Sequence, residues 1–249
     1  MHYIIFDLEF NQDLSSLQVP AEASALCPFE IIQIGAVKLD SQWSTVATFN
    51  RYIKPMIYSK ISPFITELTA ITTAQLTNEE AFPEVYHDFL EFIEDVDSVF
   101  CTWGKTDMKE LFQNVAYHKL NQRQLPRLYI NLQPYASLHF DLPEKRLLRL
   151  RSTVEELGLP LTYPFHNALH DAYYTAEIFK KIYSPAMLPK LYDPIYVNVN
   201  ILPRQPKRKI DFDALLLQFE KMYQRQMTAE EKDILKIAYQ MGKTQQFLK

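Results

Sequence analysis

Apolar residues dominate the beginning of the chain in short, nearly continuous runs that predict β-strands. Such runs span residues 3–10, 30–39 and 44–53, and residues 40–42 form a short polar turn between the second and the third. The first run is apolar at its central positions on both faces, as expected of an inner strand covered by helices. This part of the chain therefore predicts three antiparallel strands.

Helical periodicity then alternates with short buried runs. An apolar stripe at helical spacing starts near Phe82, and a buried strand at 98–103 breaks at Gly104 before a helix from about Thr106. Further along, the pattern predicts a strand at 127–132 and helices at 152–157 and 168–183. Strands that alternate with helices predict an α/β fold, a mixed sheet with helices on both faces.

The composition changes after residue 183. Residues 184–210 hold five prolines and a basic cluster at 204–209, which predicts a linker. The chain is thus expected to consist of one large domain, a linker and a helical tail, at residues 1–183, 184–210 and 211–249.

The tail is predicted to form two amphipathic helices, at about 212–225 and 229–241. Thr228 and Glu231 stand in the spacing of a capping box at the start of the second helix, which ends at Gly242. The apolar surface of these helices is too small for an independent core. We expect it to pack on the large domain, on a protein partner or on a second copy of the chain in a homodimer.

Composition narrows the functional classes. With four glycines among 249 residues, the chain has no glycine-rich phosphate loop. A net charge of −4 argues against a long, nonspecific grip on nucleic acid, although not against an enzyme whose metal ions contact the phosphate. Two cysteines, no signal-peptide layout and no run long enough to span a membrane predict a soluble cytoplasmic protein.

The strongest chemical signal is a pair of acids inside the first apolar strand. Asp7 and Glu9 stand two residues apart, so their side chains point to the same face. Two neighbouring buried carboxylates are costly unless a cation lies between them, and oxygen ligands favour magnesium or manganese. Asp107 follows where the 98–103 strand breaks, and His166 and Asp171 accompany the start of the 168–183 helix.

These three segments resemble the exonuclease motifs of the DEDD superfamily of 3′–5′ exonucleases. The histidine that stands five residues before the last aspartate, His166, is typical of the DEDDh branch. The segments at 60–63 and 67–72 and the Trp-Gly pair before Asp107 are similar to the Eri1-like subgroup. In that subgroup the loop usually reads Leu-Thr-Gly-Ile, and this chain has Ala70 in place of the glycine. The resemblance covers about residues 1–183.

The resemblance implies a ribonuclease H-like fold and two-metal hydrolysis of a phosphodiester. Asp7, Glu9 and Asp171 would hold one Mg²⁺ or Mn²⁺ ion, Asp7 would bridge to a second, and Asp107 would act partly through water. His166 would accept the proton of the attacking water, and His170 is the competing candidate, although a helix turns it about 100° away from Asp171. The products would be nucleoside 5′-monophosphates.

The same resemblance suggests contacts to the 3′-terminal nucleotide by Phe10, Leu68 and Thr69. The alternative is structural: Leu68 would anchor its loop in the core, and Phe10 would be an ordinary apolar residue at a strand end. Trp103 is expected in the core rather than as a stacking platform.

Three functions remain open on the sequence alone. The leading hypothesis is a metal-dependent 3′–5′ exonuclease acting on single-stranded 3′ ends of RNA or DNA, with short RNA or RNA tails favoured. The second is a nucleic-acid-binding adaptor that lost its chemistry, which predicts the loss of an acid that this chain retains. The third is a proofreading module recruited to a polymerase through the tail.

Overall fold

The computed structural model describes residues 2–12, 27–143, 146–194 and 212–243. The chain forms two compact units, residues 1–198 and residues 199–249. The basic cluster predicted at 204–209 lies outside the described residues, as does most of the predicted linker.

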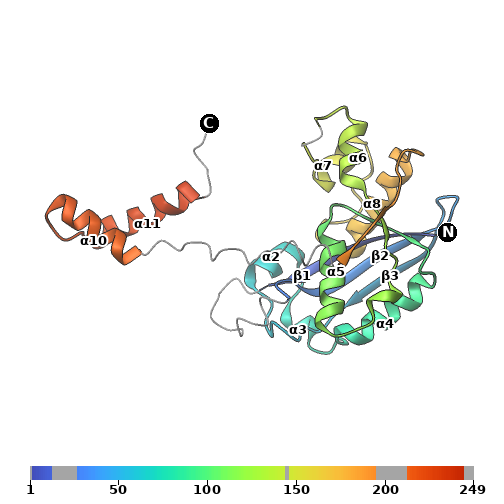
Figure 1. The fold of residues 1–249 in the computed structure, drawn as a ribbon, viewed down its shortest axis with the longest axis horizontal. Helices are drawn as coiled ribbons and strands as arrows, with labels where there is room; N and C mark the ends of the chain where they lie inside the picture. Colours follow the sequence, from blue (N-terminus) through green and yellow to red (C-terminus); the bar gives the residue numbers. More distant parts are fainter. Residues whose placement is uncertain (1, 13–26, 144–145, 195–211, 244–249) are drawn as a thin grey trace. The chain divides into compact units, whose positions relative to one another are not determined.

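A mixed sheet forms the centre of the first unit (Figure 1). Its described strands run in the order β3-β2-β1-β4-β5-β6. Neighbours are antiparallel from β3 to β1 and parallel from β1 to β5, and β6 pairs antiparallel with β5. The strands are β1 (Tyr3–Asn11), β2 (Glu30–Leu39), β3 (Thr45–Tyr52), β4 (Val99–Thr102), β5 (Leu128–Asn131) and β6 (Lys190–Leu191). This arrangement confirms the predicted mixed α/β sheet.

Helices cover both faces of the sheet, and a short 3₁₀ helix, η1, spans Gln122–Gln124. The α-helices of this unit are α2 (Pro63–Thr69), α3 (Thr73–Leu76), α4 (Phe82–Ile93), α5 (Thr106–Tyr117), α6 (Leu132–His139), α7 (Leu150–Glu156) and α8 (Ala168–Ile182). Successive residues of a strand point to opposite faces. Ile4 and Phe6 of β1 therefore join the core formed with α4 and α5, whereas Tyr3 and Ile5 join the core beneath α6, α7 and α8.

The segment after β3, which the sequence presented as a loop, folds into the short helices α2 and α3. Ser62 Oγ accepts a hydrogen bond from Ile65 N at 3.3 Å, and Pro63 occupies the first turn of α2. Thr72 and Gln75 form a capping box at α3. Helix α6 begins at Leu132, the last residue of the strand predicted at 127–132, and the rest of this helix was not predicted. Helices α2, α3 and α6 contain too few turns for a clear hydrophobic period, so their caps are the better signal.

Ala70 ends α2 in the left-handed region, with φ 61° and ψ 8°. A side chain with a Cβ is strained there, by roughly 1–2 kcal/mol, and glycine is not. We therefore expect Ala70→Gly to raise the free energy of unfolding by about 1 kcal/mol and Tm by about 2–4 °C. Thermal melts test this, with Ala116→Gly as the comparison, because Ala116 is an exposed residue of α5 without a positive φ, so glycine should lower stability there. An Ala70→Gly variant no more stable than the unsubstituted chain would contradict the assignment of strain at Ala70.

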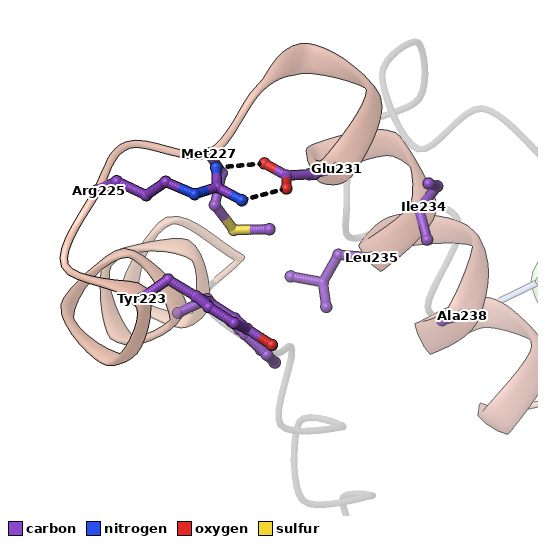
Figure 2. A pocket seen from close by; sticks show the side chains of 8 residues that line it. Tyr223, Arg225, Met227, Glu231, Ile234, Leu235 and Ala238 are labelled. Atoms are coloured by element: carbon purple, nitrogen blue, oxygen red, sulfur yellow. Dashed lines mark hydrogen bonds and ion pairs between the residues drawn. The ribbon is translucent and has the colours of Figure 1, made fainter.

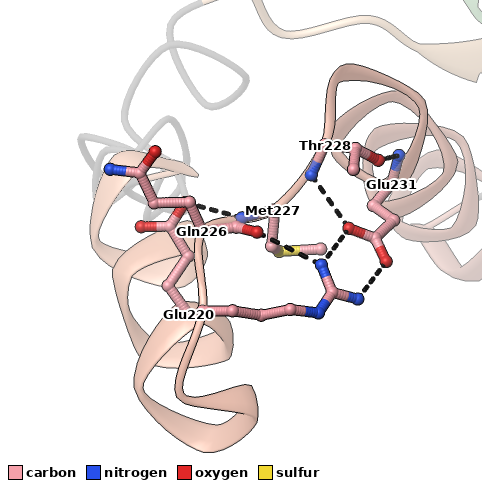
Figure 3. Close-up of polar contacts among 6 residues, drawn as sticks. Glu220, Gln226, Met227, Thr228 and Glu231 are labelled. Carbon is pink, nitrogen blue, oxygen red and sulfur yellow. Dashed lines mark hydrogen bonds and ion pairs between the residues drawn. The ribbon is translucent and has the colours of Figure 1, made fainter.

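The second unit is described over a helical hairpin, α10 (Phe212–Tyr223) and α11 (Ala229–Lys243), close to the two predicted helices. The Arg225 guanidinium forms two hydrogen bonds to the Glu231 carboxylate, at 2.9 and 2.5 Å (Figure 2). Thr228 N donates to Glu231 Oε2, and Glu231 N donates to Thr228 Oγ1, which is the predicted capping box (Figure 3). These contacts, led by Arg225, lower the pKa of Glu231 to about 2.

The two tail helices leave apolar side chains at the surface. A pocket of about 310 Å³ lies within the hairpin, and its lining includes Phe219, Met227 and Leu235. Ile234 and Met222 are each about two-thirds exposed, at 65% and 66%. Among the described residues, the hairpin therefore leaves part of its apolar surface exposed. In the part of the chain that the structure describes, no helix has the length and apolar character needed to cross a membrane.

Candidate active site

Strand β1 runs past the end of its parallel neighbour, and this overhang carries the first two acids. β4 pairs with β1 from Tyr3↔Val99 to Ile5↔Cys101, whereas β1 continues to Asn11. Asp7 and Glu9 lie beyond those pairs, on the same face of the sheet as Tyr3 and Ile5, which is the face covered by α8. Asp7 is half-buried and Glu9 is buried.

Helix α8 approaches the same face very closely. A Cβ atom added at Gly35, the β2 residue opposite Asp7, would lie 2.0 Å from Leu169 N and 2.1 Å from the carbonyl carbon of Ala168. Gln33, opposite Glu9, accepts a hydrogen bond from Ala168 N at 3.2 Å and donates one to Asn50 at 2.9 Å. Glycine therefore allows the backbones to touch, and the glutamine side chain holds the first turn of α8 over β1 and β2.

Asp107 reaches the site from the opposite helical layer. β4 ends at Thr102, Gly104 turns the chain with φ 110°, and α5 begins at Thr106. Gly104 N donates to Asn131 Oδ1 at 3.0 Å, which fixes this turn to the end of β5. The Asp107 side chain is buried, and hydrogen bonds from its own backbone amide and that of Leu8 stabilise its carboxylate.

His166 lies on the loop before α8, with φ 63°. Its backbone N donates to Asp171 Oδ2 at 3.0 Å, so the loop is joined to the first turn of α8. Positive φ is uncommon outside glycine and is found at functional sites held by their surroundings. Tyr174 supplies such support, since its hydroxyl accepts from Tyr163 N at 2.7 Å and donates to Tyr163 O at 2.8 Å.

The acids and the histidine converge. Glu9, His166 and Asp171 each offer a ligand atom, and these three atoms all lie within 4.8 Å of one another. Asp7 and Asp107 fall outside that tight group, but their charges interact with the same carboxylates. The structure thus brings together all five residues that the sequence singled out for catalysis.

The crowding of acids dominates the electrostatics. Burial, with the charges of Asp107, Glu9 and Asp171 added, raises the pKa of Asp7 well above its usual range. Burial and the neighbouring acids raise the pKa of Glu9 to about 8. Burial raises the pKa of Asp107 to about 7 and, despite the His166 amide, that of Asp171 to about 6. Carboxyls with pKa values so far above normal are typical of functional sites.

This arrangement fits divalent cations. Asp171 Oδ1 is buried and has no hydrogen-bond partner among the described residues. A buried anionic oxygen without a partner is costly, and a cation beside it removes that cost. The donor set is rich in carboxylate oxygen, which suits Mg²⁺ or Mn²⁺.

The three residues expected at the terminal nucleotide lie in different environments. Leu68 is 40% exposed and is thus not a core anchor, whereas Thr69 is buried. The Thr69 hydroxyl donates to Ile65 O at 2.8 Å and accepts from Ile71 N at 3.1 Å, so it is engaged within its own helix end. Phe10 is half-buried and packs edge-on against Phe29, with ring centroids 5.9 Å apart.

Three residues that position the site were not singled out from the sequence. They are Gln33, Gly35 and Tyr174, which hold α8 and the loop before it. Gly35 carried a signal, since a glycine inside a buried strand indicates that another backbone comes close. Nothing in the sequence pattern distinguishes Gln33 or Tyr174 from other polar and aromatic residues of their elements.

A mixed sheet whose central strand ends among a cluster of acids is a fold that this chain shares with solved nuclease structures. A solved structure, the nuclease domain of 3′hExo, a DEDDh family member, bound to rAMP, superimposes with a TM-score of 0.64. The superposition covers 77% of this chain and 96% of that domain, at 21% sequence identity, and it shows that the two share a fold. The chain belongs to the exonuclease family RNase T, whose family model matches residues 4–179.

Relatives in sequence agree with this family. The probable 3′–5′ exonuclease KapD of Bacillus subtilis (strain 168) is 28% identical over 160 residues, 61% of this chain and 73% of that protein. ERI1 exoribonuclease 3 of Homo sapiens is 24% identical over 193 residues, 73% of this chain but only 53% of that protein. The predicted family and the predicted class of enzyme, a nuclease, are therefore confirmed.

The raised pKa values predict that the metal-free protein loses stability as the pH rises. The unfolded acids titrate near pH 4, whereas folded Asp171, Asp107 and Glu9 titrate at about 6, 7 and 8. Between these limits the folded state binds more protons, so the stability that these acids contribute is complete below about pH 4 and is lost as the pH rises to about 8. Each unit of pKa difference corresponds to about 1.4 kcal/mol per proton.

Thermal melts between pH 5 and pH 8.5 in a chelator measure this slope. Saturating Mn²⁺ should remove most of it, because the ion stabilises the charged form of the same carboxylates. A slope that is equal with and without the ion would contradict the assignment of these acids to a metal site.

Proposed function

We propose that this chain is a metal-dependent 3′–5′ exonuclease. It hydrolyses phosphodiester bonds at single-stranded 3′ ends of RNA or DNA, with short RNA favoured, and releases nucleoside 5′-monophosphates. The observation that carries the proposal is the convergence of four acids with raised pKa values and His166 on one strand end, in a chain of the exonuclease family.

The acids would hold two divalent ions. Asp7, Glu9 and Asp171 would hold one ion, Asp7 would also serve the second, and Asp107 would act partly through water. When bound, such ions activate a water molecule and stabilise the charge that develops on the leaving 3′ oxygen. The close backbone contact at Gly35 and the Gln33 hydrogen bond hold the first turn of α8, which carries Asp171, against β2, and this close packing supports the assignment.

His166 is the proposed general base, which accepts the proton of the attacking water at a ring nitrogen. Partial desolvation and the nearby charge of Arg151 lower the pKa of His166 below its usual value. The ring is therefore neutral, and able to accept a proton, at neutral pH. The competing His170 is occupied elsewhere: Nδ1 lies 3.1 Å from Pro164 O, and the ring stacks on Tyr163.

The matched variants His166→Gln and His170→Gln separate the two candidates. Loss of a general base typically lowers the rate by about 10²–10⁴-fold. We expect a fall of that size in kcat for His166→Gln and a much smaller fall for His170→Gln, which only loosens a loop contact. Initial rates of mononucleotide release at pH 7.5 measure both. The assignment would be wrong if His170→Gln were the slower variant.

The proposed activity is tested on labelled oligonucleotides. Matched single-stranded and double-stranded RNA and DNA, with recessed and overhanging 3′ ends, are incubated with Mg²⁺ or Mn²⁺ and with a chelator. Stepwise release of 5′-mononucleotides from the 3′ end, only with the metal, supports the proposal. Absence of mononucleotides from every substrate would overturn it.

The tail hairpin is proposed to bind a protein partner or a second copy of the chain through its exposed apolar residues, such as Met222 and Ile234. Light scattering of the full chain and of a chain without residues 211–249 tests self-association.

A cytoplasmic location is proposed on the two free, buried cysteines, Cys27 and Cys101, which suit a reducing compartment.

A further inference from the structure

A pocket of about 900 Å³ opens beside the acids on the side of α7. Asp171 and His166 form one end of it, and Trp103 and Gln133 form another part of the wall. Arg149 and Arg151, at the start of α7, also line it. The pocket therefore connects the acid cluster directly to two guanidinium groups.

The position of Arg151 is set by an aromatic ring rather than by a strong ion pair. Its Cζ lies 5.2 Å from the centre of the Phe165 ring, in a cation–π arrangement next to His166. Its Nε lies 3.5 Å from Glu155 Oε1, and both side chains are more than half exposed. Such an exposed pair contributes little, so the donors of Arg151 are available to an anion. Arg149 is exposed as well.

Negatively charged and positively charged side chains thus occupy different parts of the site. The acids of β1 and α8 need cations and lie where the cleaved phosphate would be held. The guanidinium groups of the two arginines bind anions, and both arginines line the same pocket. Phe10 of β1 and Leu68 of α2 are the proposed neighbours of the terminal nucleotide, and neither lines this pocket. A strand that reaches the acids with its 3′ end towards Phe10 would continue, in its 5′ direction, into the pocket beside α7.

We propose that Arg149 and Arg151 bind the phosphate on the 5′ side of the bond that is cut. The pocket receives the nucleotide attached to it, with Trp103 and Tyr163 as apolar walls. This inference rests on the proposed exonuclease function and adds a preference for substrates with at least two phosphodiesters. Guanidinium groups suit it because they donate paired hydrogen bonds to phosphate oxygens.

Two substrates that differ in the second phosphate test the inference. One is a single-stranded tetranucleotide, and the other is the p-nitrophenyl ester of thymidine 5′-monophosphate, which has a single phosphodiester and nothing on its 5′ side. We expect Arg151→Gln to lower kcat/KM on the tetranucleotide about tenfold and Arg149→Gln/Arg151→Gln about a hundredfold, mostly through KM. On the ester, measured at pH 8, where the His166 ring is neutral with or without the charge of Arg151, both variants should stay within about twofold of the unsubstituted chain, which also shows that they are folded.

Arg123→Gln is the matched control, because Arg123 is an exposed arginine of η1 that does not line the pocket. The salt dependence gives a second readout: the slope of log kcat/KM against log salt should decrease by about 0.7 for each lost phosphate contact. Equal losses on both substrates, or an effect of Arg151→Gln no larger than that of Arg123→Gln, would overturn the inference. If the unsubstituted chain cleaved neither substrate, the proposed function itself would fail, and this inference with it.

Discussion

Asp7→Asn is expected to abolish hydrolysis and, at the same time, to stabilise the metal-free protein. The amide keeps the shape of the side chain but removes a charge that lies among Asp107, Glu9 and Asp171. Loss of a shared metal ligand removes several kcal/mol of transition-state stabilisation, so kcat should fall by at least about 10³-fold. Relief of like-charge repulsion should raise the unfolding free energy in a chelator at pH 8 by about 1 kcal/mol.

The two effects are measured separately. Mononucleotide release with Mn²⁺ gives the first, and thermal melts with and without Mn²⁺ give the second. Asp97→Asn is the matched control, because Asp97 is exposed and its removal changes the net charge equally. An active Asp7→Asn variant would contradict the proposed metal site. If the unsubstituted chain were also inactive and both bound oligonucleotide equally, the adaptor hypothesis would be supported instead.

Gly35→Ala should lower both the stability and the activity, because no side-chain rotation can relieve the clash of the new methyl group with backbone atoms. The new Cβ would meet backbone atoms of Ala168 and Leu169 at 2.0–2.5 Å, so α8 would have to move away from β2. We expect the unfolding free energy to fall by about 3 kcal/mol, at the upper end of overpacking effects. In the folded fraction, displacement of Asp171 by about 1 Å should lower kcat about 10²-fold.

Gly158→Ala provides the comparison for this substitution. Gly158 has φ 61°, and a Cβ there would meet no atom within 4 Å. It should therefore lose about 1 kcal/mol through backbone strain alone and keep full kcat. Urea unfolding and initial rates, measured well below the thermal transition, distinguish the two variants. A Gly35→Ala protein that kept both its stability and its kcat would show that α8 does not need this close approach.

Much of the fold could be predicted because the long elements have strong periodic patterns. β2 was expected at 30–39 and spans those residues, and α8 differs from its expected range by one residue at its end. The helices α2 and α3 could not be predicted in this way, because they are specified by local hydrogen bonds at Ser62 and Thr72 rather than by an apolar stripe. Ala70 illustrates the same point. Its left-handed φ is imposed by the end of α2, although alanine itself favours a negative φ.

The candidate site could be predicted as a set of chemical groups but not as a geometry. Asp7 and Glu9 were identifiable because charges inside an apolar strand require an explanation. The support for these groups was not visible in the sequence. Gln33 fixes α8 through a single amide contact, and Tyr174 anchors a loop eleven residues before it. Such contacts depend on which segments meet in the folded protein, and no periodic pattern in the sequence indicates them.

The Tyr174 hydroxyl also has a consequence for how this enzyme can change. It joins the loop at Tyr163 to α8, the helix that carries Asp171. The loop with His166 and the start of α8 are therefore held together by hydrogen bonds. The stretch from Gly158 to Thr162, which lies before that anchor, is largely exposed. Insertions or replacements there should reshape the wall of the arginine-lined pocket while His166, the proposed proton acceptor, keeps its position. Variants that exchange only these residues are therefore expected to alter the preferred substrate length without loss of the proposed chemistry.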